Sequence, residues 1–235
     1  MVGEPALSVV ILCYRSEGSI IGFVHDTLEV VRKLTSDYEV ILVANYVEGT
    51  DDKTIDYAKQ LEQEDNRIFT LAKPKKGMMG WDMRQGLDAA TGKHICVIDG
   101  DGQFPITSIA ECYAEIIKGN HDLVKTYRTK RNDGFYRSMI SAVYNALFSI
   151  LFPGLGSKDA NSKPKIISKE AYQKMTLKSD DWFVDAEIML NIRDLEMSFL
   201  EIPVEFKKLE GRTSFVKFQA VFEFLRNLIH YRLKK

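Results

Sequence analysis

The sequence predicts an α/β fold: a mainly parallel twisted sheet flanked by helices. Two observations predict it. Short runs that are apolar throughout alternate with segments of helical periodicity, and each interval between runs is long enough for one helix. Continuous apolar runs are typical of strands buried on both faces. Alternation of strand and helix at this spacing specifies parallel pairing with helices on both faces.

The first strand is predicted at Leu7–Tyr14, and a helical pattern follows from about Ser19, a candidate N-cap, to Leu34. The further elements of this half are a strand at Glu39–Ala44, a helix at about Asp51–Gln63, a strand at Arg67–Leu71, a helix at Gly80–Ala90 and a strand at His94–Asp99.

After about Thr126 the alternation fades. The elements expected there are a helical segment at Met139–Phe152, a Gly/Pro/Ser-rich stretch at Pro153–Pro164, a strand at Lys165–Ser168, a helix capped by Ser168 and running through Met175, a helix at Trp182–Leu195, an extended segment at Phe199–Val204 and a long amphipathic helix at Phe215–Leu233. No repeat or linker divides the chain, so we expect one domain over residues 1–235.

Composition excludes several classes of protein. The chain has 235 residues, 45% of them hydrophobic, and a net charge of −1. It can bury a large core, it lacks the basic excess of a nucleic-acid binder, and it is too apolar to be disordered. Three cysteines in apolar segments, without metal-ligand spacing, indicate buried free thiols in a reducing compartment. The four histidines are scattered and show no metal-ligand spacing either.

The sequence shows no secretory signal and no apolar stretch of about 18 residues, the length of a membrane span. We therefore expect a soluble or peripheral protein that is cytoplasmic or lies at the cytoplasmic face of a membrane. The C-terminal segment is apolar, aromatic and basic at its end. It suits a membrane interface, a partner subunit or a second copy of the chain, or packing on its own domain.

The segment Asp99-Gly100-Asp101-Gly102-Gln103 follows a buried strand. Ligands of open parallel sheets bind beyond the carboxyl ends of the strands. Two carboxylates with glycines between them suit Mg²⁺ or Mn²⁺, which take carboxylate, water and substrate phosphate oxygens. An ordinary acidic turn is the alternative.

Three segments carry a resemblance to family 2 glycosyltransferases. Ser8–Ile20 resembles their S-V-V-I-P-x-Y-N-E-E-x-S-I opening, Gly86–Gly92 their G-L-x-x-A-x-G segment, and Asp99–Pro105 their D-A-D-L-Q-x-P metal motif. The chain is most similar to the polyprenyl-phosphate hexosyltransferase branch, which includes dolichol-phosphate mannosyltransferases. The resemblance spans about residues 7–214. It implies the GT-A fold and an inverting, Mg²⁺- or Mn²⁺-dependent transfer of a hexose from a nucleotide-diphosphate sugar to a polyprenyl phosphate.

The resemblance assigns Asp99, Asp101 and Gln103 to the metal and diphosphate, with Asp101 also catalytic. It assigns Tyr14 and Glu17 to the base and ribose. Asn45 stands nearest to the family's base-recognising aspartate, and Arg84, at the start of a helix facing the site, reaches a phosphate or pairs with Asp88. This donor half covers residues 1–125.

Residues 126–214 form the expected acceptor half, followed by the C-terminal helix at 215–235. Here the resemblance implies that Arg128, Arg137 and Ser141 bind the acceptor phosphate. It also implies that Arg212 belongs to a loop that closes on the donor phosphates, and that Arg212 is catalytic. Arginine suits these roles because its planar fork binds two phosphate oxygens. Asp159–Lys165 resembles the family's D-x-x-S-G-F-R segment, with Lys165 in place of arginine.

Asp185 and Glu187 resemble the family's F-x-D-x-E-x-L segment. In relatives with hydroxyl acceptors an acid here is the general base; with a phosphate acceptor, Asp185 orients groups or acts electrostatically. The alternative is that both acids favour a helix N-terminus.

Two other functions stay open, and a third is disfavoured. The first is transfer to a hydroxyl in glycan or cell-envelope synthesis, and the second is a non-catalytic subunit that binds nucleotide sugars. The third, nucleotidyl transfer, needs a glycine-rich loop that Tyr14–Gly18 does not supply. The expected partners are a nucleotide sugar and a lipid phosphate, with peripheral membrane contact, no nucleic acid, and either a homodimer or a partner subunit. The sequence fixes neither the base nor the sugar.

Overall fold

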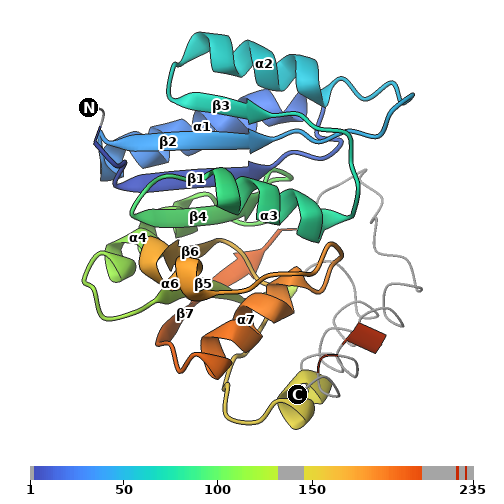
Figure 1. Ribbon diagram of the computed structural model, residues 1–235. Coiled ribbons are helices and arrows are strands. Elements are labelled where there is room, and N and C mark those ends of the chain that lie inside the picture. The colour runs from blue at the N-terminus through green and yellow to red at the C-terminus, as the bar shows by residue number, and fades with distance from the viewer. Residues whose placement is uncertain (1–2, 132–145, 208–225, 228–230, 232–235) are drawn as a thin grey trace.

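A seven-stranded sheet organises the computed structural model, which describes residues 3–131, 146–207, 226, 227 and 231 (Figure 1). The elements are β1 (Leu7–Leu12), α1 (Ser19–Leu34), β2 (Tyr38–Val43), α2 (Thr54–Glu64), β3 (Ile68–Leu71), α3 (Met79–Ala89), β4 (His94–Asp99), α4 (Thr107–Ile116), β5 (Leu123–Arg131), β6 (Lys165–Ser168), α6 (Lys169–Lys174), α7 (Val184–Asp194) and β7 (Phe199–Phe206). The predicted α/β class is confirmed.

The strand order is β3-β2-β1-β4-β6-β5-β7. Strands β1 to β4 pair in parallel, β6 runs antiparallel to both β4 and β5, and β7 is parallel to β5. The carboxyl ends of β1, β2, β4 and β5 and the amino end of β6 therefore meet at one edge of the sheet, here called the carboxyl edge. The arrowheads of β1, β2 and β3 point toward it in Figure 1.

Two apolar layers enclose the sheet. Helices α1, α2 and α4 cover one face, and α3, α6 and α7 cover the other. Within β1, Val9 and Ile11 pack into the first layer, and Val10 and Leu12 into the second. This two-sided burial is the reason that the strand is apolar throughout.

Most boundaries lie within a few residues of those predicted, but two elements were not predicted individually, α4 and β5. The sequence concealed β5 because Lys125 and Thr126 are polar and yet fully buried in it. Capping differs at one helix. Gly18, not Ser19, precedes α1 as its cap residue, whereas Ser168 caps α6 as predicted by accepting the Ala171 N–H at 3.2 Å.

The predicted C-terminal helix lies mostly outside the described residues, as do Arg137, Ser141, Arg212 and the first part of the predicted helix at Met139–Phe152. Residues 146–151 are helical. Of the C-terminal segment, the Asn227 amide donates to Asp181 at 2.5 Å, and the Tyr231 ring packs on Phe152 and Phe183. These two residues thus contact the domain itself.

The three cysteines are buried free thiols, as predicted. Within the described ranges no helix combines the length and apolar character needed to cross a membrane.

Gly86 sets how closely α3 approaches the sheet. A Cβ at this position would lie 2.4 Å from Val10 Cγ1 and 2.8 Å from Val43 Cγ2. The helix therefore packs on β1 and β2 at a distance that leaves no room for a side chain, and this packing holds the start of α3 next to the carboxyl edge.

We predict that Gly86→Ala lowers the free energy of unfolding by about 1–3 kcal/mol, because the added methyl overpacks the helix–sheet contact. The control is Gly22→Ala in the exposed part of α1, where a Cβ meets nothing within 4 Å. That change is expected to stabilise by up to about 1 kcal/mol, through helix propensity. Urea unfolding of both variants checks this; a Gly86→Ala variant as stable as Gly22→Ala would contradict the packing argument.

Candidate active site at the carboxyl edge of the sheet

The loop after β1 brings Tyr14 and Glu17 to the carboxyl edge. Arg15 and Glu17 have positive φ values of 52° and 46°, so the chain turns sharply there. The Glu17 N–H donates to Thr54 Oγ1 at 2.9 Å, which ties the loop to the start of α2. The Tyr14 ring lies 4.1 Å from the Lys75 ammonium, a cation–π contact. An aromatic ring and a cation thus stand together where the resemblance puts the base and ribose.

The acidic turn follows β4 at the same edge. Gly100 is packed so closely that a Cβ there would lie 2.9 Å from Ile20 Cδ1, and its N–H donates to the Leu12 carbonyl at 3.0 Å. Asp101 accepts the Gln103 N–H at 3.0 Å, and Gly102 has φ +72°, a conformation that favours glycine. Both glycines are therefore required by the turn that presents the two carboxylates.

These carboxylates suit a divalent cation whose coordination shell is completed by a bound substrate and water. Within the described part of the chain no three His, Cys, Asp or Glu side chains form a metal-binding group. Mg²⁺ and Mn²⁺ are commonly held by one or two carboxylates together with substrate phosphates and water. Asp99 and Asp101 meet that requirement. The Gln103 side chain donates instead to the Lys207 carbonyl, at 3.4 Å.

Asn45 is 2% exposed, and its amide is engaged inside the protein. Its Nδ2 donates to Asp82 at 2.9 Å, and its Oδ1 accepts the Lys73 N–H at 2.9 Å. The other Asp82 oxygen binds the Lys75 ammonium. Burial raises the pKa of Asp82, and the contacts with Lys75 and Asn45 offset part of this rise. Asn45 thus connects the loops that hold Lys75 against the Tyr14 ring. Its amide groups bond to Asp82 and Lys73, and its predicted contact with a nucleotide base stays a prediction.

Arg84 is engaged inside the protein, and its predicted contact with a phosphate stays a prediction. Its guanidinium pairs with Asp180 and donates to the Leu177 carbonyl at 3.0 Å, so it ties α3 to the segment before α7. The alternative pair with Asp88 is wrong, since Asp88 accepts the Tyr172 hydroxyl at 2.5 Å.

Asp185 is buried between two lysines. Its oxygens lie 2.9 Å from Lys163 Nζ and 2.5 Å from Lys165 Nζ, and the side chains of all three residues are at most 2% exposed. Burial by itself would raise the Asp185 pKa, but the two ammonium groups outweigh it and lower the pKa. The predicted general base is thus already fully paired. Glu187 is engaged too, since its carboxylate accepts the N–H groups of Lys178 and Ser179 at 2.9–3.0 Å.

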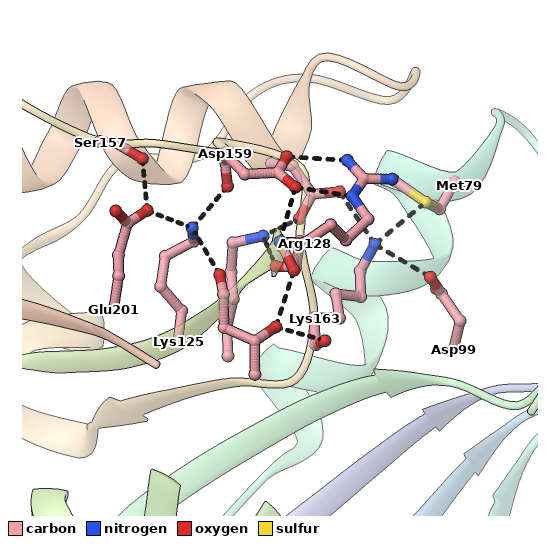
Figure 2. Close-up of polar contacts among 12 residues, drawn as sticks. Met79, Asp99, Lys125, Arg128, Ser157, Asp159, Lys163 and Glu201 are labelled. Carbon is pink, nitrogen blue, oxygen red and sulfur yellow. Dashed lines mark hydrogen bonds and ion pairs between the residues drawn. The ribbon is translucent and has the colours of Figure 1, made fainter. Parts of the chain in front are cut away.

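The two lysines have different surroundings. Lys163 Nζ also lies 3.4 Å from Asp99, and Figure 2 shows it between Asp99 and Met79. Although burial favours the neutral form, Asp185 and Asp99 raise the pKa of Lys163. Burial is the largest influence on the pKa of Lys165, and it lowers the pKa. Asp185 offsets this only partly, and the neighbouring lysines lower the pKa further, to about 8.

Arg128 forms a two-point ion pair with Asp159, at 2.6 Å and 2.7 Å (Figure 2). Its guanidinium also lies over the Phe206 ring. Burial would raise the Asp159 pKa, but the hydrogen bonds and charge of Arg128, with Lys125, hold it at about 2. Lys125 Nζ binds Glu201 at 2.8 Å and the Asp159 carbonyl at 2.5 Å. Arg128 therefore comes to the carboxyl edge with its guanidinium fixed.

The structure thus brings Tyr14, Glu17, Asp99, Asp101 and Arg128 to one edge, and it places Asp185 beneath them. Two functional candidates were missed. Lys163 was overlooked because only the antiparallel pairing of β6 puts it beside Asp99. Lys75 was overlooked because its contact with Tyr14 depends on the buried Asn45–Asp82 bond. For Lys163 a signal was present: it stands where the family's D-x-x-S-G-F-R segment has glycine.

Comparisons with known proteins agree with this geometry. The profile of the family described as Glycosyl transferase family 2 matches residues 8–177. The chain is 30% identical over 144 residues to an undecaprenyl-phosphate 4-deoxy-4-formamido-L-arabinose transferase of Photorhabdus laumondii; the match covers 61% of this chain and 43% of that protein. It is 23% identical to a dolichyl-phosphate beta-glucosyltransferase of Trichomonas vaginalis, over 97% of this chain and 74% of that one.

Among solved structures, glucosyl-3-phosphoglycerate synthase of Mycobacterium tuberculosis, in complex with Mn²⁺, uridine diphosphate and phosphoglyceric acid, has a similar fold. The TM-score is 0.71 at 16% identity, over 96% of this chain and 76% of that one. The chain thus spans less than half the length of the undecaprenyl-phosphate relative and about three quarters of the other two proteins.

The Asp159–Arg128 pair predicts an acid-labile contribution to stability. The Asp159 pKa is about 2 in the folded chain, against about 3.9 when unfolded. The contribution is therefore fully present above about pH 4 and is lost as the pH falls through 2. Between pH 5 and pH 2 the wild type should lose about 2 kcal/mol more than Asp159→Asn.

Urea midpoints across this pH range measure the difference. The control is Asp37→Asn, at an exposed residue beside the opposite edge of the sheet, which should follow the wild type. Parallel pH curves for the wild type and Asp159→Asn would refute the assignment.

Proposed function

Since this chain belongs to glycosyl transferase family 2, we propose that it moves a hexose from a nucleotide-diphosphate sugar to a polyprenyl phosphate, with inversion at the anomeric carbon and with Mg²⁺ or Mn²⁺. The observation that carries the proposal is the acidic turn, which presents Asp99 and Asp101 at the carboxyl edge next to Tyr14. Relatives whose names specify undecaprenyl-phosphate and dolichyl-phosphate transferases support the lipid acceptor. A similar fold that binds Mn²⁺ and uridine diphosphate supports the donor.

In this proposal residues 1–125 hold the donor. Tyr14 and Glu17 contact the base and ribose, and Lys75 places positive charge beside them. Asp99 and Asp101 hold the divalent cation. When bound, the cation neutralises the charge that develops on the leaving diphosphate. Asn45 and Arg84 support this half by bracing its loops.

Residues 126–214 hold the acceptor. Arg128, fixed by Asp159, supplies positive charge toward an anion, and Arg137, Ser141 and Arg212 keep the phosphate-binding roles that the resemblance implies. An acceptor phosphate oxygen attacks the anomeric carbon from the face opposite the diphosphate. A new carbon–oxygen bond forms there, the bond to the donor diphosphate breaks, and the nucleoside diphosphate leaves.

The state of Asp185 favours a phosphate acceptor. A hydroxyl acceptor must lose a proton, and a general base within hydrogen-bond reach usually takes it. In this structure both oxygens of Asp185 are held by lysines, and Glu187 holds backbone N–H groups. A phosphate acceptor is already an anion and needs no such base. Asp185 is then a positioning residue, not a catalytic one.

A lipid acceptor requires contact with a membrane surface, which we place at the cytoplasmic face. The side chain of Ile150, on the helical residues 146–151 of the acceptor half, is 74% exposed, and such a side chain suits an apolar surface. The C-terminal segment remains a second candidate for membrane or protein contact.

We predict that one of UDP-, GDP-, CDP- or dTDP-sugars raises the melting temperature far more with Mn²⁺ than without it. At a hundredfold excess over Kd the shift should be about 5–10 °C. Asp101→Ala should abolish the metal-dependent shift, and Asp37→Asn should retain it. No shift with any donor, for folded protein, would overturn the proposal in favour of a different role for the fold.

The acceptor is tested with that donor, radiolabelled in the sugar. We predict transfer to a polyprenyl phosphate and none to the polyprenol of the same length, since only the phosphate matches the arginines and needs no base. Transfer to the polyprenol or to a glycan hydroxyl would contradict the assigned acceptor. Donor binding without transfer to any of the three would indicate a non-catalytic nucleotide-sugar-binding protein.

A further inference from the structure

Lys163 lies beside the acidic turn because of the sheet register. Strand β6 is antiparallel to β4, and Val97 pairs with Lys165. Lys163, two residues before Lys165, is therefore level with Asp99, two residues after Val97. The Lys163 ammonium lies 3.4 Å from the Asp99 carboxylate. A lysine from the acceptor half thus reaches a carboxylate of the donor half.

The position of this ammonium group is fixed. The Lys163 side chain is 2% exposed, and its Nζ lies 2.9 Å from Asp185, 3.4 Å from Asp99 and 3.6 Å from Met79 Sδ (Figure 2). Asp185 is itself held by Lys165, at 2.5 Å. Burial and these contacts leave Lys163 little freedom to turn away from Asp99.

The charges of this cluster balance only when Asp99 is included. Two lysines, Lys163 and Lys165, face the single carboxylate of Asp185, which leaves one positive charge in excess. Asp99, with a side chain that is 27% exposed, is the further carboxylate within ion-pair distance of Lys163. Asp99 therefore reaches the carboxyl edge already partly neutralised, whereas Lys163 makes no such pair with Asp101 in the described part of the chain.

We propose that Lys163 is a built-in cation of the donor site: it lowers the affinity of the empty site for a divalent cation and attracts the donor diphosphate, so that metal and nucleotide bind together. A positive charge a few ångströms from Asp99 opposes a second cation there and favours an anion. Lys163 acts through Asp99 and through its field, so it is a positioning residue. The inference rests on the proposed function, because it concerns the same donor site.

The test measures both ligands separately. Mn²⁺ binding is followed by the electron paramagnetic resonance signal of free Mn²⁺, without nucleotide. Lys163→Met should bind Mn²⁺ about tenfold more tightly than the wild type, the size of one partly screened charge interaction. Binding of UDP and of GDP is then measured in EDTA, and the better of the two should bind several-fold more weakly to the variant. Opposite signs for cation and anion identify an effect of charge, because structural damage would weaken both.

Three variants control for structure. Lys165→Met removes a lysine that is equally buried and bound to the same Asp185, but it leaves the Lys163–Asp99 pair in place, so its Mn²⁺ affinity should rise much less than that of Lys163→Met. Lys163→Arg keeps the charge and should restore weak Mn²⁺ binding. If Lys163→Met does not fold, Lys163→Gln removes the same charge but keeps a polar side chain, and its Mn²⁺ and nucleotide affinities are measured instead.

The outcomes are distinguishable. Unchanged or weaker Mn²⁺ binding in a folded Lys163→Met or Lys163→Gln variant would overturn this inference alone, provided that the wild type binds Mn²⁺ with a nucleotide. An equal gain in Lys165→Met would also overturn it. If the wild type binds neither Mn²⁺ nor any nucleoside diphosphate, the proposed function fails and this inference fails with it.

Discussion

Charge that is buried in the second half of the fold is paired, and these pairs position the site. A buried ion without a partner costs several kcal/mol, so each lysine in this region needs a carboxylate in a fixed place. Asp185 meets Lys163 and Lys165, and Glu201 meets Lys125. These contacts connect β5 to β7 and β6 to α7. They add little net stability in themselves, but they leave the carboxyl edge few alternative arrangements.

This constraint also limits the chemistry. An acid that neutralises two lysines is poorly placed to take a proton from a substrate, and this favours the positioning role proposed for Asp185. Because Asp185 is shared between two lysines, Lys163 also forms an ion pair with Asp99. The proposed anionic acceptor and the proposed cation of the donor site both follow from this one buried cluster.

Family membership, shown over residues 8–177, accounts for the fold and the acidic turn, but it does not identify the substrate. The two relatives are named for different sugars and for polyprenyl phosphates, and the solved structure of similar fold is a complex with phosphoglyceric acid. What distinguishes this chain lies in its departures from the family pattern. Asn45 is buried as a brace, and Lys163 stands where the family has glycine. Both departures change the surroundings of the donor and not the sheet that supports it.

The sequence by itself determined the parallel half of the sheet and the acidic turn. Local patterns encode both, since burial on two faces makes a strand apolar throughout, and Asp99–Gln103 is contiguous in the chain. It did not predict β5, whose buried Lys125 breaks the apolar pattern, and it did not predict the ion-pair partners of Asp185 and Asp99. Only the tertiary structure decided those, because the antiparallel insertion of β6 brings Lys163 to Asp99, and no local signal reports which distant charge will neutralise another.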